Sequence, residues 1–183
     1  MKMKFYNAFI LVLFIFFVGC ATIHTTDKPI VTEASDRWVL LPFNNSTQTP
    51  GAASSTEEIM AALMMSIKNI NLIRYRDEED RSPLLLVNDD KLYKDALNWA
   101  RQQGFKYGIH GSVNEWRYKA GLDGEPAVAI TVYVVDVTTG KVIWSGTGAR
   151  SGWGRESIST VAHKVLTKIL DRLKLTRGEE KNL

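Results

Sequence analysis

Cysteine is nearly absent from this 183-residue chain, which contains only Cys20. One thiol cannot form an internal disulfide, so a disulfide-stapled fold is excluded. Histidine is also scarce: the three residues are His24, His110 and His163. None has a second ligand at the spacing of a metal site, so we predict no bound metal and a surface or packing role for these histidines.

Motifs for catalysis and cofactor binding are also missing. The stretch that begins at Ser151 is not a nucleophile elbow, because that motif needs glycine two residues away on both sides of the serine. No glycine-rich loop has the pattern that cradles phosphates. Asp123 and Glu125 lie close in sequence, but two carboxylates alone do not make a hydrolase. We therefore predict a protein without catalytic residues or cofactors.

The first twenty residues have the pattern of an export signal. Lys2 and Lys4 give a basic start, and Ala8 to Val18 contains no polar or charged side chain. That run is too short to span a bilayer easily, which takes about 20 residues. A basic start, a short apolar stretch and a small-residue cleavage site indicate a secretory signal.

The end of this signal, Phe17-Val18-Gly19-Cys20, resembles the bacterial lipobox, at which signal peptidase II cuts before an acylated cysteine. Acylation also explains why an exported protein keeps one cysteine; the alternative is an uncleaved anchor with a buried cysteine. Ala21 and Thr22 follow, with no aspartate at the second mature position, and similarity to sorted lipoproteins then indicates the outer membrane. We predict a lipid-anchored protein that faces the periplasm.

The charge of the mature chain is nearly balanced. Two of the 23 basic residues, Lys2 and Lys4, leave with the signal, so 21 basic side chains remain against 20 acidic ones. This balance gives no support for nucleic-acid binding, which requires a basic surface. Composition divides the chain into four predicted parts: a signal peptide (1–19), a lipidated flexible tether (20–35), a single α/β periplasmic domain (36–176) and a polar tail (177–183).

Apolar periodicity predicts the elements of the domain. Helices are expected from Ser54 to about Lys68, from Asn88 or Asp89 to Gly104, and from Ile158 to Leu173. The first should begin with a capping box, because Ser54 and Ser55 precede Glu57 and Glu58 by three residues. Strands are expected over 37–43, 70–75, 105–113, 128–134 and 142–145, with a bulge or exposed extension near Asn114.

This order of elements favours an α/β sandwich in which three helices cover a mostly antiparallel twisted sheet. The arrangement is similar to the TolB N-terminal and CsgG-like periplasmic domains.

Two loops stand out. The segment Lys119–Pro126 contains two glycines, two acids and a proline, which is typical of an exposed turn; an ordinary polar hairpin tip is the alternative. Trp153 is flanked by Gly152 and Gly154, with arginines nearby. A tryptophan in such a loop suits a membrane interface, whereas the alternative is a side chain folded back onto the core.

Four stretches resemble the PelC family of outer-membrane lipoproteins from the Pel exopolysaccharide export system. The most specific, Glu115–Val128, begins Glu-Trp-Arg-Tyr-Lys. The others are Leu41–Asn45, the hairpin with Asp136, Thr139, Gly140 and Trp144, and Arg150–Ser157.

The resemblance implies a non-catalytic protein that forms a ring at the periplasmic face of the outer membrane. Its partners would be the outer-membrane porin and periplasmic scaffold of the Pel system, and outer-membrane lipid through Cys20. The family's polymer is a partly deacetylated amino-sugar chain and is therefore cationic. Asp123, and more weakly Glu125, would guide it electrostatically. Trp153 would belong to an aromatic belt at the membrane.

Two other functions remain open. An outer-membrane lipoprotein that activates a peptidoglycan synthase through the periplasm would share the fold, tether and turn signature. The predicted tether of about 15 residues reaches at most ~50 Å, which favours a domain held near the outer membrane. A curli-type secretion subunit would need a long amphipathic membrane hairpin, and the sequence offers no suitable strand pair.

Overall fold

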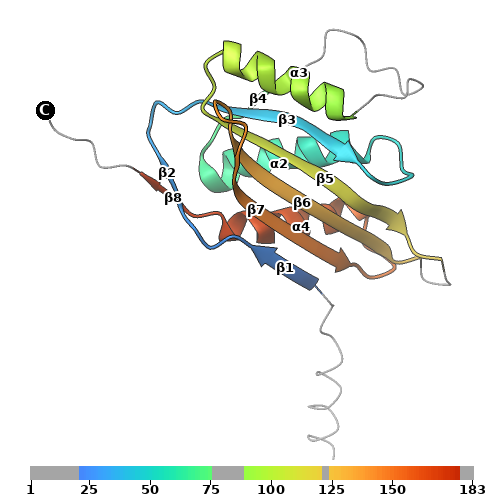
Figure 1. Ribbon diagram of the computed structural model, residues 1–183. Coiled ribbons are helices and arrows are strands. Elements are labelled where there is room, and N and C mark those ends of the chain that lie inside the picture. Colours follow the sequence, from blue (N-terminus) through green and yellow to red (C-terminus); the bar gives the residue numbers. More distant parts are fainter. Residues whose placement is uncertain (1–20, 76–88, 121–123, 178–183) are drawn as a thin grey trace, which may run out of the picture.

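The computed structural model of the chain describes residues 21–75, 89–120 and 124–177 (Figure 1). Two residues with predicted roles, Cys20 and Asp123, lie outside these ranges. In the described ranges, no helix combines the length and the apolar character that crossing a bilayer requires.

The domain is built on a six-stranded sheet with the order β1-β7-β6-β5-β3-β4. The pairs β1–β7, β7–β6 and β6–β5 are antiparallel, whereas β5–β3 and β3–β4 are parallel. The strands are β1 (Ala21–Thr25), β3 (Trp38–Asn45), β4 (Ile73–Arg74), β5 (Tyr107–Tyr118), β6 (Pro126–Asp136) and β7 (Val142–Ser151). The prediction of a mostly antiparallel sheet is confirmed.

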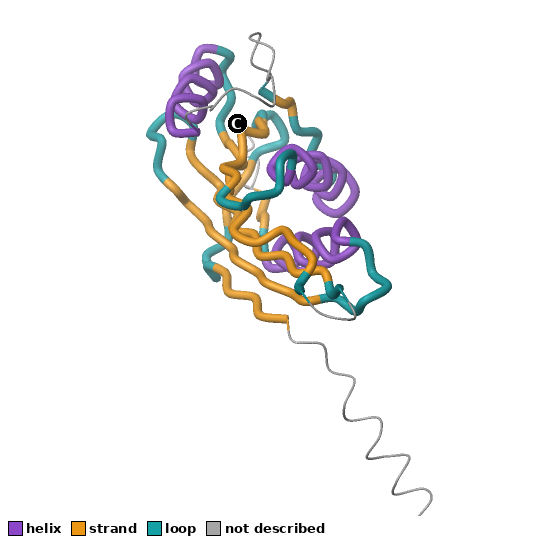
Figure 2. The backbone as a smooth tube through the Cα atoms, turned by 90° about the vertical axis from the view of Figure 1, so that its right-hand side faces the viewer, coloured by secondary structure: helices purple, strands orange, loops and turns teal. Residues whose placement is uncertain are grey.

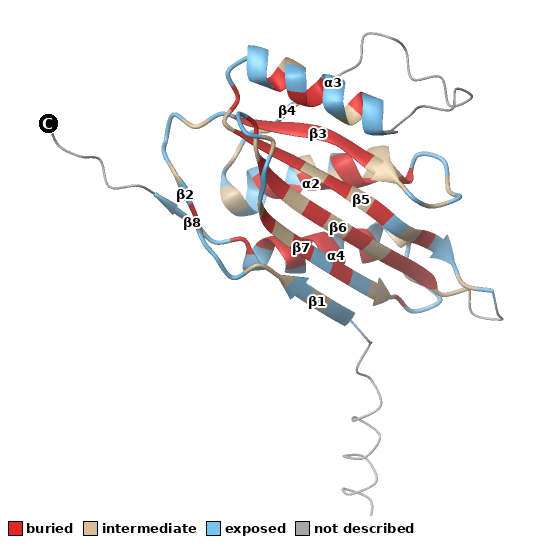
Figure 3. Cartoon of the chain, in the orientation of Figure 1, coloured by how far each residue is buried: buried red, intermediate tan, exposed pale blue. Residues whose placement is uncertain are grey.

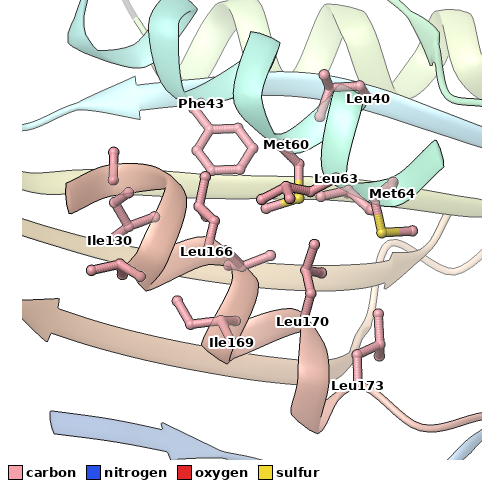
Figure 4. Packing of buried hydrophobic residues seen from close by; sticks show 14 of the residues in the cluster. Leu40, Phe43, Met60, Leu63, Met64, Ile130, Leu166, Ile169, Leu170 and Leu173 are labelled. Atoms are coloured by element: carbon pink, nitrogen blue, oxygen red, sulfur yellow. The ribbon is translucent and has the colours of Figure 1, made fainter. Parts of the chain in front are cut away.

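Three helices cover the two faces of this sheet unequally. The helices α2 (Ala52–Lys68) and α4 (Ile158–Arg172) lie side by side on one face, and α3 (Asp89–Gln102) lies on the other (Figures 1 and 2). The main core fills the space under α2 and α4, where Met60, Leu166 and Ile169 pack against alternate residues of β6 such as Ile130 (Figure 4). A smaller cluster joins α3 to β3 and the end of β6. The predicted α/β sandwich is confirmed.

The segment predicted as a flexible tether contributes two strands, and the prediction is wrong at those residues. Strand β1 pairs with β7, and β2 (Ile30–Thr32) pairs in parallel with β8 (Leu175–Arg177). Gly148 in β7 leaves room for Ile23, since a Cβ there would lie 2.5 Å from Ile23 Cδ1. An edge strand needs few apolar residues, so the polar sequence around Ile23 conceals it.

The predicted capping box at the start of α2 is also wrong. The helix begins after Gly51, whose φ of 78° is left-handed, and no side chain caps it. Glu57 is only 3% exposed. Its carboxylate instead accepts the N–H of Phe43 at 2.9 Å and pairs with Arg74 at 2.8 Å, so it ties α2 to strands β3 and β4.

Most other predicted elements agree with the structure. The bulge falls between Val113 and Glu115, as predicted. Helix α3 buries one apolar stripe and ends before Gly104, which has a φ of 72°; the stripe is Leu92, Ala96, Leu97 and Ala100. The strand predicted over 70–75 shrinks to β4, and the last strand of the sheet extends to Ser151 instead of Ser145.

Candidate functional site

Strand pairing brings three distant segments to one end of the sheet. Ala21, at the start of β1, pairs with Arg150 near the end of β7. Ala127, near the start of β6, pairs with Ser151. We call this region the anchor end: Ala21, the described parts of the β5–β6 tip (117–120 and 124–126) and the loop 151–157. It lies at the right of the domain in Figure 1.

The β5–β6 tip holds Glu125. The backbone N–H of Lys119 donates to the carbonyl of Glu125 at 2.7 Å, which closes the base of the tip. The side chains of Lys119 and Glu125 are both partly exposed, and Lys119 Nζ lies 3.8 Å from Glu125 Oε2. Such an exposed ion pair is weak, so the Glu125 carboxylate stays accessible to a stronger cationic ligand.

Trp153 projects from the loop between β7 and α4, and its side chain is 53% exposed. The alternative of a tryptophan folded into the core is therefore wrong. Its neighbour Gly152 is buried, and the Gly152 N–H donates to the carbonyl of Pro126 at 2.7 Å. A Cβ at Gly152 would lie 2.6 Å from Val161 Cγ2, so the close packing of this loop requires glycine.

Glu156 fixes the same loop. Its carboxylate accepts the backbone N–H of Trp153 at 3.0 Å and the ammonium of Lys164. These bonds, first the one from Lys164 and then the one from Trp153, hold the pKa of Glu156 below its usual range. Ser157 then caps α4, because its hydroxyl accepts the N–H of Thr160 at 3.1 Å. The loop is thus held rigidly although its tryptophan is exposed.

Tyr118 is a second exposed aromatic residue at the anchor end, and it has no predicted role of its own. Its side chain is 54% exposed, and its hydroxyl accepts the N–H of Ile158 at 3.2 Å. The signal for it is the change of phase at the bulge, after which Trp116 and Tyr118 become the bulky positions. Figure 3 shows exposed residues gathering toward the end of β5.

The described residues contain no group of three histidine, cysteine or acidic side chains that could hold a metal ion. The three histidines lie apart: His24 on β1, His110 on β5 and His163 on α4. His110 Nδ1 bonds the carbonyl of Pro42 and its ring packs against Tyr93 and Tyr133, so its environment is that of a packing residue. The anchor end offers charge, aromatic surface and rigidity, all of which suit binding.

Comparisons with known proteins relate this geometry to solved structures. No family model and no curated protein matches the chain. Two crystal structures of the PelC dodecamer from Paraburkholderia phytofirmans match it at 34% identity, with TM-scores of 0.70 and 0.69. Both alignments cover 86% of this chain and 100% of the other.

Lipoprotein GNA1162 from Neisseria meningitidis has the same fold, with 14% identity, a TM-score of 0.56 and coverage of 75% of this chain and 96% of the other. At that identity the likeness concerns the fold alone. The PelC structures are similar along their whole length and well above that level. The chain belongs to the PelC family.

Proposed function

We propose that this protein is a non-catalytic lipoprotein of Pel exopolysaccharide export that works as a ring at the periplasmic face of the outer membrane. Family membership supports the export role, and the relatives of known structure are dodecamers. The observation that carries the proposal is the pairing of Ala21 with Arg150. This pairing places the residue after Cys20 at the same end of the sheet as Trp153.

The short distance between lipid and domain supports this orientation. Cys20 precedes Ala21 directly, and consecutive Cα atoms lie about 3.8 Å apart. Because β1 is part of the sheet, the acylated cysteine has no slack of 15 residues to extend. The anchor end must then lie at the membrane surface. The short reach also weighs against a regulator that contacts a synthase across the periplasm.

The side chains at the anchor end suit that surface. Trp153 and Tyr118 are exposed aromatic residues, and such rings favour the headgroup level of a bilayer. Arg155 is an exposed cation and Lys119 a partly exposed one at the same end, and long basic side chains can reach lipid phosphates from there. We infer that Trp153 enters the interface beside the acyl chains of Cys20.

The β5–β6 tip would act on the polymer. In a ring, each copy contributes Asp123 and Glu125 to the same level, so weak single charges sum to a field that attracts a cationic amino-sugar chain. The polymer would pass this acidic level on its way to the outer-membrane porin, and the periplasmic scaffold of the system would deliver it. The role needs electrostatic guidance and no catalytic group.

Two substitutions test the proposal in cells that depend on this protein for Pel secretion. We expect Trp153→Ala to reduce membrane association and export, whereas Val142→Ala should have no effect; Val142 is equally exposed, at 55%, but lies at the opposite end of β7. We expect Asp123→Lys to abolish secretion, with the exposed Asp27→Lys as the matched charge reversal. Normal secretion in both Trp153→Ala and Asp123→Lys would refute the proposed function.

A further inference from the structure

The anchor end continues into a shallow groove. Ring assembly, membrane contact by Trp153 and guidance of the polymer by the acidic tip do not explain this groove. The groove has a volume of about 650 Å³, which lies in the range of small-ligand sites. One wall is the loop after β3, and the other is the end of β5, where the Glu-Trp-Arg-Tyr-Lys motif lies. Its lining mixes polar side chains with apolar surface, and the apolar part is the larger; the residues include Thr47, Gln48, Asn114, Glu115 and Arg117 beside Trp116 and Ala129.

The bulge in β5 creates this groove. Val113 and Trp116 both belong to the main core, and two residues separate them where a regular strand would have one or three. The extra residue, Asn114, is exposed, and Glu115 follows on the face away from the core. Glu115 is paired with Ala129 across the strands, and Arg117 is paired with Ala127. Ala129 is small and only partly buried, so space remains beside Glu115, whereas Ala127 opposite Arg117 is buried.

The loop wall is fixed before any ligand arrives. The Asn45 side-chain oxygen accepts the N–H and the hydroxyl of Thr47, at 3.1 and 2.7 Å. The hydroxyl of Thr49 donates to the carbonyl of Trp116 at 2.6 Å, which ties the loop to β5. A wall held this way loses little conformational entropy on binding.

Glu115 and Arg117 present a mixed donor and acceptor group at the centre of the groove. Arg117 Nε donates to Glu115 Oε1 at 2.8 Å. In the part of the chain that the structure describes, Glu115 Oε2 and the two terminal nitrogens of Arg117 have no hydrogen-bond partner. The pair therefore offers one carboxylate oxygen and the outer donors of a guanidinium within one ligand-sized space.

We propose that this groove binds a short segment of an amino-sugar polysaccharide. Vicinal hydroxyls both donate and accept, which matches the pair and the amides of Asn114 and Gln48. A free amine of a deacetylated unit is a cation that Glu115 Oε2 can accept in a charge-assisted hydrogen bond.

The position of the groove relative to the tip supports this ligand. Arg117 lies two residues before Lys119, which is about 7 Å along a strand. A chain that passes the acidic tip would therefore reach the groove within one or two sugar units. The inference rests on the proposed function, because export supplies the amino-sugar chain.

The test is isothermal titration of the full mature, acylated protein in detergent with a partly N-acetylated glucosamine hexasaccharide. We expect Glu115→Gln and Arg117→Ala each to weaken binding about tenfold, the factor for losing one hydrogen bond to a charged group. For Glu115→Gln the loss should shrink with the fully N-acetylated hexasaccharide, which has no cation. Glu58→Gln is the control, since Glu58 is an exposed residue of α2 outside the groove.

Wild-type affinity in both groove variants would overturn the inference. So would unchanged affinity with an altered oligomer mass by light scattering, because the groove would then be a contact between copies of the chain. The proposed function fails separately: secretion would be normal in Trp153→Ala and Asp123→Lys whatever the groove variants bind. If those two variants block secretion while the groove variants bind normally, only the groove inference is wrong.

Discussion

The two ends of the β6–β7 pair are built in opposite ways. At the end away from the anchor, the turn from Asp136 to Lys141 is closed by its own residues: Asp136 Oδ1 accepts the N–H and the hydroxyl of Thr139, at 2.7 and 2.8 Å. At the anchor end, the tip and the loop after β7 are held by contacts with α4, while Trp153 and Tyr118 remain exposed.

The difference separates stability from function within one hairpin. The turn is closed mainly by Asp136 and exposes no large aromatic residue, although Val137 also bonds Lys106 and Arg101. The anchor end keeps two large aromatic side chains in contact with solvent. Burying them would instead stabilise the fold. Such exposure beside the proposed lipid attachment point is expected of a surface that meets a membrane.

The largest effect should come from the core that both ends share. Leu166, on the inner face of α4, is fully buried, so Leu166→Ala should lower the free energy of unfolding by about 2–5 kcal/mol. Denaturant unfolding should show both ends lost in one transition. Met65→Ala, at an exposed position of α2, should change stability by less than about 0.5 kcal/mol. Separate unfolding transitions for the two ends would contradict the claim that one core supports both.

Substitution of one glycine at each end of the β6–β7 pair tests whether close packing or backbone conformation requires the glycine there. Gly152→Ala should cost about 1–3 kcal/mol, because its Cβ would press on Val161 and Glu156. Gly140→Ala should cost about 1–2 kcal/mol, because Gly140 has a left-handed φ of 71°. Asparagine adopts that backbone more readily than alanine, so thermal unfolding should show a smaller loss for Gly140→Asn than for Gly140→Ala, whereas Gly152→Asn should be worse than Gly152→Ala. The reverse pattern would refute the comparison.

Acid should weaken the turn through Asp136. Hydrogen bonds from Thr139, the backbone bond first, hold the pKa of Asp136 below its usual 3.8. A lowered folded pKa means that the stabilisation is complete above 3.8 and disappears as the pH falls through the folded value. Asp136→Ala should therefore cost about 1 kcal/mol at pH 7 and less below pH 3.8. A pH-independent difference from wild type would show that the charge is not responsible; Thr138→Ala, at an exposed neighbour, is the control.

The smallest effect on folding should come from Trp153. Since its side chain is half exposed, Trp153→Ala should change the free energy of unfolding by less than about 0.5 kcal/mol while it reduces binding to vesicles. Sedimentation with outer-membrane lipid vesicles, beside denaturant unfolding, separates the two quantities. Large destabilisation by Trp153→Ala would mean that the residue supports the fold instead of the membrane contact.

Much of the fold can be predicted from the sequence, because helical and strand periodicities are strong where a face is buried. The stripes of α3 and α4 and the phase change at Asn114 are examples. The edge strand β1 could not be predicted, since only Ile23 and Thr25 turn toward β7 glycines whose own role depends on that contact. The prediction for Glu57 was wrong for a related reason. Its position three residues after Ser54 fits a capping box, but burial beside β3 brings it to the N–H of Phe43 and to Arg74.

The candidate site was only partly predictable. Its residues can be named from the sequence, and the side chains of Trp153 and Glu125 both reach the surface, as their predicted roles require. Their assembly with the lipid attachment point depends on β1 joining β7, a long-range pairing with no local signal. Tyr118 and the groove at Glu115 and Arg117 follow from the geometry of one bulge, which periodicity locates without showing its consequences.

The most direct test of the account is a lipid-accessibility measurement at the two ends of β7. With Cys20 acylated, as we propose, Trp153→Cys and Lys141→Cys each provide a single free thiol for a nitroxide label in the vesicle-bound protein. The account predicts strong collisions with lipid-soluble oxygen at position 153 and with an aqueous quencher at position 141. An aqueous environment at position 153, or a lipid environment at position 141, would contradict the proposed orientation.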